Sequence, residues 1–317
     1  MKPKISIVLL NNNGSGYLKQ SLPSILTQDY QNLEVVIIDN GSDLSELEFL
    51  KEFPVIKLIR NTSDLGYSAG KNQGIKNASG DYVLLLDNDI YINNKSLISD
   101  LVNIKEKDSL VITFPLLDID KEVTSYYGCF LKQYGITSNK PFPIDKILSW
   151  PNLYECSYPH GGAIFINRDF FIKDFNYYDE SQTFHLDDID LGMYAWQKGL
   201  KCVVYNKDYL KHLGIKHTSN SKLQHKRFGL WFSGVTIAML KNMPITTLLK
   251  HYPLFVAYFL YKSIFKLIIN RDLGFIIKFT MSIIFSIKNI SKTIEKRADV
   301  QKRLTNHNDI YFKLNHP

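Results

Sequence analysis

The sequence predicts an α/β fold: a doubly wound, mostly parallel sheet with helices on both faces, followed by a basic region of amphipathic helices. Two observations in the first half of the chain predict the sheet. Short apolar runs of strand length alternate with segments of helical periodicity, which is the pattern of parallel sheets. Several of these runs end in Asn or Asp, and the ligands of such sheets bind beyond the carboxyl ends of the strands.

The predicted strands and helices alternate along residues 1–220. Apolar runs of strand length occur at Ile5–Leu10, Leu33–Ile38, Val55–Ile59, Gly80–Ile92, Leu110–Phe114, Ile164–Ile166 and Lys201–Tyr205. Helices are expected over Leu18–Leu26 and, after a glycine-rich loop, within Gly66–Ala78. Another helix is expected to begin near Asp187, with Leu191 at helical spacing and Gly199 as its C-cap.

Two segments follow this alternation less clearly. The stretch Lys121–Tyr158 is rich in aromatic residues, including Phe142, Trp150 and Tyr154, and we interpret it as an insertion that faces the substrate. Leu213–His217 is expected to be a last extended piece.

Charge and cysteine content narrow the function classes. The chain has 317 residues, which is enough for one large domain with an appendage or for two domains. Its net charge is +7. Residues 250–317 contain twelve Lys or Arg and four Asp or Glu, so the rest of the chain is nearly neutral. A neutral body argues against nucleic-acid binding, and the basic tail predicts an anionic partner. Cys129, Cys156 and Cys202 lie far apart, which fits a reducing compartment and neither a disulfide framework nor a zinc site.

Two acids, Asp87 and Asp89, follow the apolar run Tyr82–Leu86. Alternate side chains of an extended segment share a face, so these carboxylates are expected to point the same way. Such a pair repels unless it faces water or a cation lies between the two groups. A divalent Mg²⁺ or Mn²⁺ prefers oxygen ligands of this kind and often shares them with substrate phosphates. A polar loop that carries two acids by chance is the alternative.

Residues 221–317 form the predicted helical region. Lys262, Lys266 and Asn270 recur every four residues on an otherwise apolar segment, and Ser282 and Ser286 lie on a similar stripe of the next one. The uncharged runs are shorter than the roughly 20 residues that cross a bilayer. We therefore expect these helices to lie in the interface of an anionic membrane. A helical subdomain packed on the core or on another subunit is the alternative.

Several segments in this order resemble the family 2 glycosyltransferases, which have the GT-A fold. The resemblance covers roughly Ile5 to His217 and, in order and lengths, is most similar to the rhamnosyltransferase-like branch. It is carried by ISIVLLNNNG, VVIIDNGSDLS, DLGYSAGKNQGI, GDYVLLLDNDI, HGGAIFINRDFF and FHLDDIDLGMYAWQKG. In this family the first four segments bind a nucleoside diphosphate sugar, and the last two shape the acceptor side and supply the base.

The resemblance implies nucleotide contacts at the ends of the first strands. Asp39 is expected to accept the imide N–H of uracil or thymine, so the donor would be a UDP- or dTDP-linked sugar. Capping of the turn that follows Asp39 is the alternative role. Asn11 and Asn72 are expected to be lesser nucleotide contacts, with a polar turn residue and a helix-start cap as their alternatives.

The resemblance also implies the catalytic and metal-binding acids. Asp87 is expected to reach the ribose or the metal, and Asp89 to bind the divalent cation directly. Asp187 and Asp188 stand where the family usually has Glu-Asp, so Asp188 is expected to be the general base and Asp187 to assist it or bind acceptor. An acidic first turn that complements the helix dipole is the alternative. His217 resembles a histidine that some members use as a further metal ligand, and a structural histidine is its alternative.

These expectations describe an inverting glycosyltransferase that uses a divalent cation. The acceptor would be a glycan or lipid-linked glycan in cell-surface polysaccharide synthesis, and the protein would lie peripherally on the cytoplasmic face of the cell membrane. Two other classes are weighed against this one. A metal-dependent phosphohydrolase needs an aspartyl nucleophile after the first strand, where this chain has Asn11. A non-catalytic nucleotide-sugar-binding module would not need the acids at Asp89 and Asp188.

Overall fold

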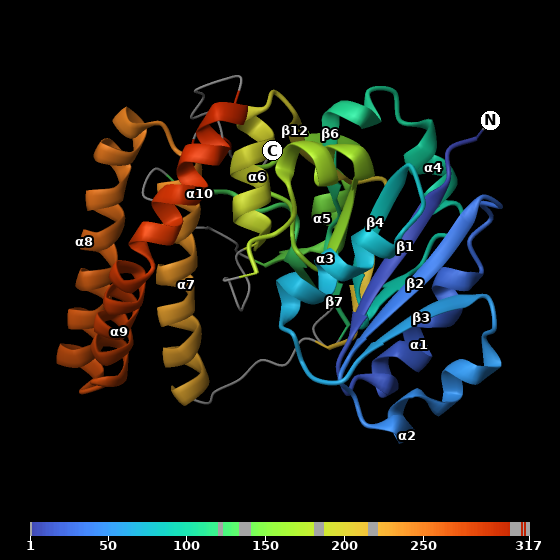
Figure 1. Cartoon of the computed structure of the whole chain (residues 1–317), viewed down its shortest axis with the longest axis horizontal. Coiled ribbons are helices and arrows are strands. Elements are labelled where there is room, and N and C mark those ends of the chain that lie inside the picture. Colours follow the sequence, from blue (N-terminus) through green and yellow to red (C-terminus); the bar gives the residue numbers. More distant parts are fainter. Residues whose placement is uncertain are drawn as a thin grey trace.

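The computed structural model describes residues 2–119, 123–132, 141–180, 187–214, 221–304, 312 and 314. Its centre is an eight-stranded sheet with the spatial order β10-β12-β6-β11-β4-β1-β2-β3 (Figure 1). In chain order these strands are β1 (Ile5–Asn11), β2 (Leu33–Asn40), β3 (Ile56–Asn61), β4 (Tyr82–Asp87), β6 (Leu110–Thr113), β10 (Leu153–Glu155), β11 (Ala163–Asn167) and β12 (Lys201–Tyr205). The mixed α/β fold with a large, mostly parallel sheet confirms the predicted fold class.

Strand direction brings several polar chain segments to one edge of this sheet. Strands β1, β2, β3 and β4 are parallel, with Asn11 opposite Asp39 and Leu10 opposite Asp87. The carboxyl ends of these strands therefore lie side by side. Strand β11 runs antiparallel to β4 and pairs Ala163 with Leu86, so the start of β11 reaches the same edge. An antiparallel strand at this position was not predicted, because an apolar run does not encode its direction.

Helices cover both faces of the sheet, as predicted. Ile7 and Leu9 of β1 pack with α1 (Ser15–Leu26) and α4 (Leu97–Asn103), and Val8 packs on the opposite face with α3 (Tyr67–Asn77). Helix α6 (Asp187–Gln197) shares that second face. The remaining short helical elements are α2 (Leu44–Leu47), η1 (Glu48–Glu52), η2 (Lys107–Ser109), α5 (Ile144–Leu148) and η3 (Phe170–Phe175).

The stretch Gly80–Ile92 is not one strand. Strand β4 ends at Asp87, a turn follows at Asn88 and Asp89, and Ile90 begins a strand of a second sheet. That five-stranded sheet has the order β5-β13-β7-β8-β9. Its strands are β5 (Ile90–Ile92), β7 (Leu116–Asp118), β8 (Val123–Tyr126), β9 (Phe142–Pro143) and β13 (Leu210–His212). The last described extended piece is thus β13, three residues upstream of the predicted one, and residues 215–217 lie outside the described part of the chain.

The aromatic residues of the middle segment pack together against the hydrophobic core. The ring centroid of Trp150 lies 5.7 Å from those of Phe142 and Tyr154. Tyr127, only 1% exposed, packs edge-to-face against Phe142 and Trp150. Aromatic pairs of this geometry add to the stability gained from burial. The interpretation of this segment as a substrate-facing insertion stays a prediction.

Four helices follow the sheet domain: α7 (Ser221–Asn242), α8 (Ile245–Asn270), α9 (Gly274–Lys288) and α10 (Ile290–Arg303). Helix α7 packs against α6, and α8 and α9 lie on its far side from the sheet (Figure 1). The boundary at residue 220 stays a prediction, because α7 starts close to it yet shares a hydrophobic core with the sheet domain.

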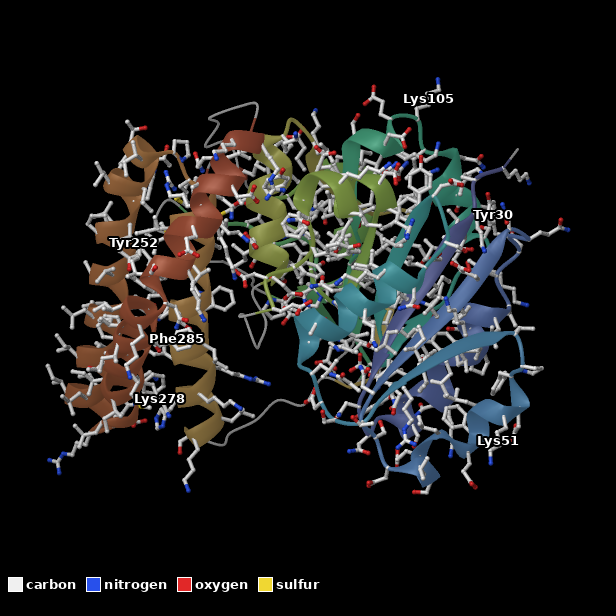
Figure 2. The ribbon with its side chains drawn as sticks, viewed as in Figure 1. Tyr30, Lys51, Lys105, Tyr252, Lys278 and Phe285 are labelled. Carbon is white, nitrogen blue, oxygen red and sulfur yellow. The ribbon has the colours of Figure 1, made fainter. Side chains whose placement is uncertain are left out.

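Helix α9 packs with its polar stripe inward. Ser282 and Ser286 are buried, and the Ser282 hydroxyl donates to the Gly229 carbonyl of α7 at 2.9 Å. Ile284 and Ile287 are exposed, as are many large apolar side chains of α8, which project away from the sheet (Figure 2). By length and composition α8 would suffice to cross a membrane, as would α9 and α10 together but for a 61° bend between them. The expectation of helices lying in the interface stays a prediction.

Candidate active site

A chain of polar side chains joins the ends of β1, β2 and β4. The Asn88 amide donates to Asn11 Oδ1 at 2.8 Å, and Asn11 Nδ2 lies 3.3 Å from Asp39 Oδ1. Asn11 and Asp39 are fully buried. These hydrogen bonds fix the side chains at the carboxyl edge, where ligands of parallel sheets bind.

Asp39 caps the turn that follows it. The backbone N–H of Ser42 donates to Asp39 Oδ2 at 3.2 Å, and the Ser42 hydroxyl donates to Oδ1. Arg60 Nε lies 3.5 Å from Oδ2. The turn itself needs Gly41, whose φ of 81° is disfavoured for other residues. The alternative role predicted for Asp39 is thus present, and its contact with a uracil or thymine base stays a prediction.

Asn72 contacts the segment before α6. Its amide donates to the Tyr178 carbonyl at 2.9 Å and accepts from the Tyr178 N–H at 2.9 Å. Nδ2 also lies 3.0 Å from Glu180 Oε1. The amide is therefore committed to protein groups, which is a structural role that was not predicted, and the nucleotide contact of Asn72 stays a prediction.

A buried lysine, Lys71, links Asp87 to the turn that precedes β11. Lys71 of α3 is 1% exposed, and its Nζ donates to the Tyr67 hydroxyl and the Gly161 carbonyl, both at 2.5 Å. Tyr67 in turn donates to Asp87 Oδ1 at 2.6 Å. The ammonium lies 3.7 Å from the same carboxylate oxygen. Burial raises the pKa of Asp87, and the charge of Lys71 opposes that rise.

The first turn of α6 brings Asp187 and Asp188 close to Gly161 and Lys71. The Gly161 N–H donates to Asp188 Oδ2 at 3.2 Å, while the Gly161 carbonyl accepts from Lys71. Burial and the neighbouring Asp187 raise the pKa of Asp188 to about 8. Burial raises the pKa of Asp187 as well, opposed by Lys71. Among the described residues, Asp187 Oδ2 is buried without a hydrogen-bond partner.

Asp89 is oriented by a histidine that sequence reasoning missed. His212 Nε2 of β13 lies 3.2 Å from Asp89 Oδ2. A Cβ atom at Gly214 would lie 2.1 Å from the same oxygen, so a larger residue there would have to displace the carboxylate. Burial lowers the pKa of His212, but Asp89 and the nearby acids raise it overall. The predicted histidine, His217, lies outside the described residues.

The acids at the end of β4 fit a hard cation by their chemistry. Within the described ranges, Asp89 Oδ1 is buried and has no hydrogen-bond partner. The same ranges contain no group of three or more His, Cys, Asp or Glu that could hold a metal. Mg²⁺ is commonly held by one or two carboxylates together with substrate phosphates and water. Asp89 with Asp87 is a donor set of this kind, and it would be completed by a diphosphate.

Two pairs of acidic residues lie around Lys71 and Gly161, one pair on each side. On one side, Asp87 and Asp89 could hold a cation and an anionic leaving group. On the other, Asp187 and Asp188 form a buried carboxyl pair with raised pKa values, as expected for a general base working near neutral pH. The site can therefore support metal-assisted displacement of a phosphorylated leaving group by a deprotonated nucleophile.

Comparison with protein families gives one match to this chain over residues 6–174, with the model described as glycosyl transferase family 2. The chain is 36% identical over 115 residues to an uncharacterized glycosyltransferase of Haemophilus influenzae. It is 27% identical over 131 residues to glycosyltransferase GlyG of Streptococcus pneumoniae. These matches cover 35% and 40% of this chain and 46% and 44% of the relatives, so the chain spans less than half the length of either.

Solved structures share the fold at low sequence identity. S. aureus TarS in complex with UDP-GlcNAc matches with a TM-score of 0.58 and 14% identity, covering 95% of this chain and 88% of that one. The mannosyltransferase PcManGT from Pyrobaculum calidifontis, in complex with GDP-Man and Mn²⁺, matches with a TM-score of 0.57 and 12% identity, covering 96% and 86%. Both matches extend over the helices that follow the sheet domain.

Proposed function

Because the chain belongs to glycosyl transferase family 2, we propose that it is an inverting enzyme that moves a sugar from a nucleoside diphosphate sugar to an acceptor hydroxyl. The observation that carries this proposal is that Asp87 and Asp188 are linked through two residues. Lys71 contacts Asp87 and the Gly161 carbonyl, and the Gly161 N–H donates to Asp188. One acid serves the leaving diphosphate and the other the incoming hydroxyl. A phosphohydrolase would need an aspartyl nucleophile after β1, where Asn11 is buried in hydrogen bonds.

In this mechanism Asp188 removes the proton of the acceptor hydroxyl, which attacks the anomeric carbon directly. A covalent intermediate on the protein is not required. Asp87 and Asp89 would hold the divalent cation, which when bound offsets the charge that develops on the departing phosphate oxygens. Tyr67 and Lys71 fix Asp87 by their contacts with Oδ1 and keep that carboxylate from turning away. Asp187 assists Asp188 as the second carboxyl group of the pair or contacts the acceptor.

The donor is proposed to be a UDP- or dTDP-linked sugar, with Asp39 facing the base. The fold neighbours named above bind UDP-GlcNAc and GDP-Man, so donors of this chemical class fit the fold. Rhamnosyl transfer is the finer proposal from the sequence resemblance. A panel of nucleotide sugars, incubated with the purified protein and Mn²⁺ and assayed for released nucleoside diphosphate, tests both. Absence of hydrolysis with every donor, together with absence of UDP binding by calorimetry, would contradict the proposed function.

We also propose that the enzyme acts peripherally at the cytoplasmic face of the cell membrane, on a glycan carried by a lipid. The surface of α8 and α9 supports this, because large apolar side chains such as Ile269 and Ile287 are exposed there. The positive surplus of residues 250–317 complements anionic lipid headgroups. Assembly of a cell-surface polysaccharide would then take place beside the site.

The apolar face of α8 and α9 gives a prediction about lipid binding. Replacing Ile268, Ile269 and Ile287 with serine should lower binding to phosphatidylserine–phosphatidylcholine vesicles at least tenfold. These side chains are 69%, 64% and 64% exposed, and each would contribute about 1.5–3 kcal/mol when buried in lipid. Co-sedimentation measures the binding. Val55→Ser, at an equally exposed site on the sheet domain, is the control. Unchanged binding of the triple variant would mean that another surface contacts lipid.

A further inference from the structure

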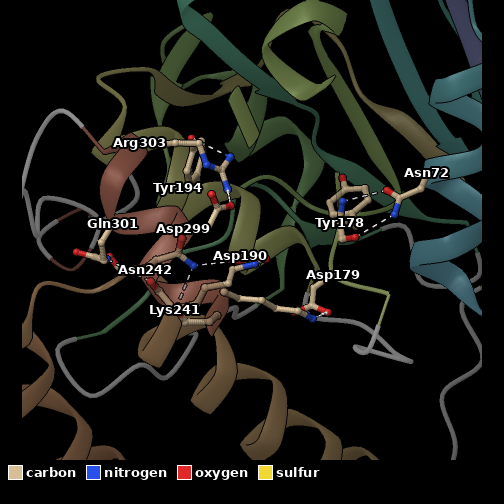
Figure 3. Close-up of polar contacts among 12 residues, drawn as sticks. Asn72, Tyr178, Asp179, Asp190, Tyr194, Lys241, Asn242, Asp299, Gln301 and Arg303 are labelled. Carbon is tan, nitrogen blue, oxygen red and sulfur yellow. Dashed lines mark hydrogen bonds and ion pairs between the residues drawn. The ribbon is translucent and has the colours of Figure 1, made fainter. Parts of the chain in front are cut away.

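Helix α6 is joined to α7 through a buried ion pair behind its catalytic turn. Asp190 is 1% exposed and forms an ion pair with Lys241, which is also buried (Figure 3). Asn242 Nδ2 donates to the other carboxylate oxygen of Asp190 at 2.6 Å. Both oxygens of Asp190 are therefore held by the end of α7, one helical turn from Asp187.

A second ion pair holds the segment before α6 to the tail. Lys296 of α10 contacts Asp179, a buried residue, at 2.5 Å. The neighbouring Tyr178 is fixed from the opposite side by the Asn72 amide of α3. Asp179 and Asp190 are thus both tied to the C-terminal helices.

The two ion pairs belong to one rigid support. Arg297 of α10 donates to the carbonyls of Leu240 and Met243, at 2.6 and 2.7 Å, and so caps the end of α7. Gln301 Nε2 donates to the Asn242 carbonyl at 3.0 Å. Lys241 therefore reaches Asp190, and Lys296 reaches Asp179, from two helices that are hydrogen-bonded to each other.

Such pairs set geometry more than stability. Removing two charges from water offsets most of their attraction, and buried ion pairs can often be replaced by apolar residues without loss of stability. They remain directional, because each carboxylate oxygen must meet a particular donor. A general base must be placed to within about 0.5 Å of its working position, and a shift of about 1 Å can cost about 100-fold in rate.

We propose that Asp190–Lys241 and Asp179–Lys296 are positioning pairs that set Asp187 and Asp188 against Gly161 and Lys71. Helices α7 and α10 are then part of the catalytic unit, while the α8–α9 pair carries the lipid-facing surface. The proposal rests on the glycosyltransferase function proposed above for its effect on rate. It predicts that removing residues 221–317 abolishes catalysis as well as membrane binding.

Two sets of variants test the proposal, one for each pair, and the first leaves no buried charge unpaired. Asp190→Asn/Lys241→Met removes both charges of the first pair and retains a polar group beside Asn242. Lys296→Met breaks the second pair, and Lys296→Arg should restore it, because Lys296 is partly exposed and leaves room for the larger side chain. Lys198→Met is the matched control, since Lys198 bonds the Arg303 carbonyl of α10 and Asp174 away from the catalytic turn.

The first measurement is hydrolysis of the best donor in the panel, with UDP binding in Mn²⁺ by calorimetry. We expect kcat to fall about 10–100-fold in the double variant and in Lys296→Met. The Kd for UDP should stay within about twofold, because the donor-side residues are untouched. Lys198→Met and Lys296→Arg should retain kcat. Equal losses of kcat in Lys198→Met, or a parallel loss of UDP binding, would overturn the positioning role.

The second measurement is hydrogen exchange of the free protein, which does not depend on activity. Amides of Asp187–Tyr194 should exchange faster in the double variant than in wild type, while those of β1 and β4 should not change. Unchanged exchange at α6, or equal acceleration throughout the chain, would overturn the proposal. A wild-type protein that neither hydrolyses a donor nor binds UDP contradicts the proposed function, and the exchange result still decides whether the pairs position α6.

Discussion

Replacing Asp188 with asparagine should lower kcat about 10²–10⁴-fold, the usual contribution of a general base. Asparagine keeps the size of the side chain and can accept from the Gly161 N–H, but it cannot take a proton. The binding of UDP should remain nearly unchanged, because the residues around Asp39 and Asp89 are not altered. Transfer or hydrolysis kinetics, with calorimetry of UDP in Mn²⁺, separate these two effects.

The pH dependence of kcat/KM in the wild-type enzyme also tests the role of Asp188. Burial and the proximity of Asp187 raise the pKa of Asp188, so the carboxylate form that can act as base is gained as pH rises. The two acids titrate as a pair, and the rate should report the ionisation of the pair. We expect kcat/KM to increase with pH through the neutral to mildly alkaline range and to fall as pH is lowered. In Asp188→Asn this limb should be lost.

Asp187→Asn distinguishes the roles of the two neighbours. Adjacent helical residues point about 100° apart, so one of the two carboxylates faces an incoming hydroxyl better than the other. We expect a smaller loss of kcat for Asp187→Asn and a rise in the KM for acceptor. A large loss with Asp187→Asn and near-normal kcat with Asp188→Asn would exchange the roles. Full activity of both variants would contradict the mechanism.

The fold could be predicted from the sequence wherever burial leaves a periodic signal. Strands such as β1 and β4 are buried on both faces and read as continuous apolar runs. The turn at Asn88 could not be predicted, because the acids on either side fit an extended segment equally well. The direction of β11 and the second sheet depend on pairings between distant segments, which local periodicity does not encode.

In the C-terminal helices, the sequence pattern predicts a polar stripe but not the surroundings that this stripe contacts. The polar stripe that includes Ser282 was visible in the sequence, but a stripe does not say which side meets protein. Ordinary amphipathic helices turn their polar side to water, whereas Ser282 faces the backbone of α7. Gly229 permits this approach, because a Cβ atom there would lie 2.8 Å from the Ser282 hydroxyl.

The site divides in a similar way. Asp87 stands out in the sequence as an acid at the end of an apolar strand, whereas Asp188 was expected from the resemblance to glycosyltransferases. The roles of both residues stay predictions. Lys71 could not be predicted, because a lysine within a helix is normally exposed, and only the folded chain supplies Tyr67 and the Gly161 carbonyl to bury it. His212 carries no local signal beyond its residue type.

Loss of the Asp89 charge should also reduce activity strongly, by about 100-fold or more, because a bound cation contributes several kcal/mol to stabilising the developing charge. Asp89→Asn is preferable to alanine. It keeps an oxygen acceptor for His212 and the shape beside Gly214, so the local packing is preserved. The expected defect is a weaker affinity for Mn²⁺ in the presence of UDP, measured by calorimetry, with a matching fall in kcat/KM.

Asp81→Asn provides the matched control for this substitution. Asp81 lies just before β4, at the other end of the strand from Asp89, and accepts a hydrogen bond from the Lys4 N–H. The same change there should leave Mn²⁺ affinity and rate unaltered. Chelation of the cation by EDTA should reduce wild-type activity to the level of Asp89→Asn, and re-addition of Mn²⁺ should restore the wild type alone. Full activity of wild type in EDTA, or of Asp89→Asn at low Mn²⁺, would show that the acids at the end of β4 serve the donor without a metal.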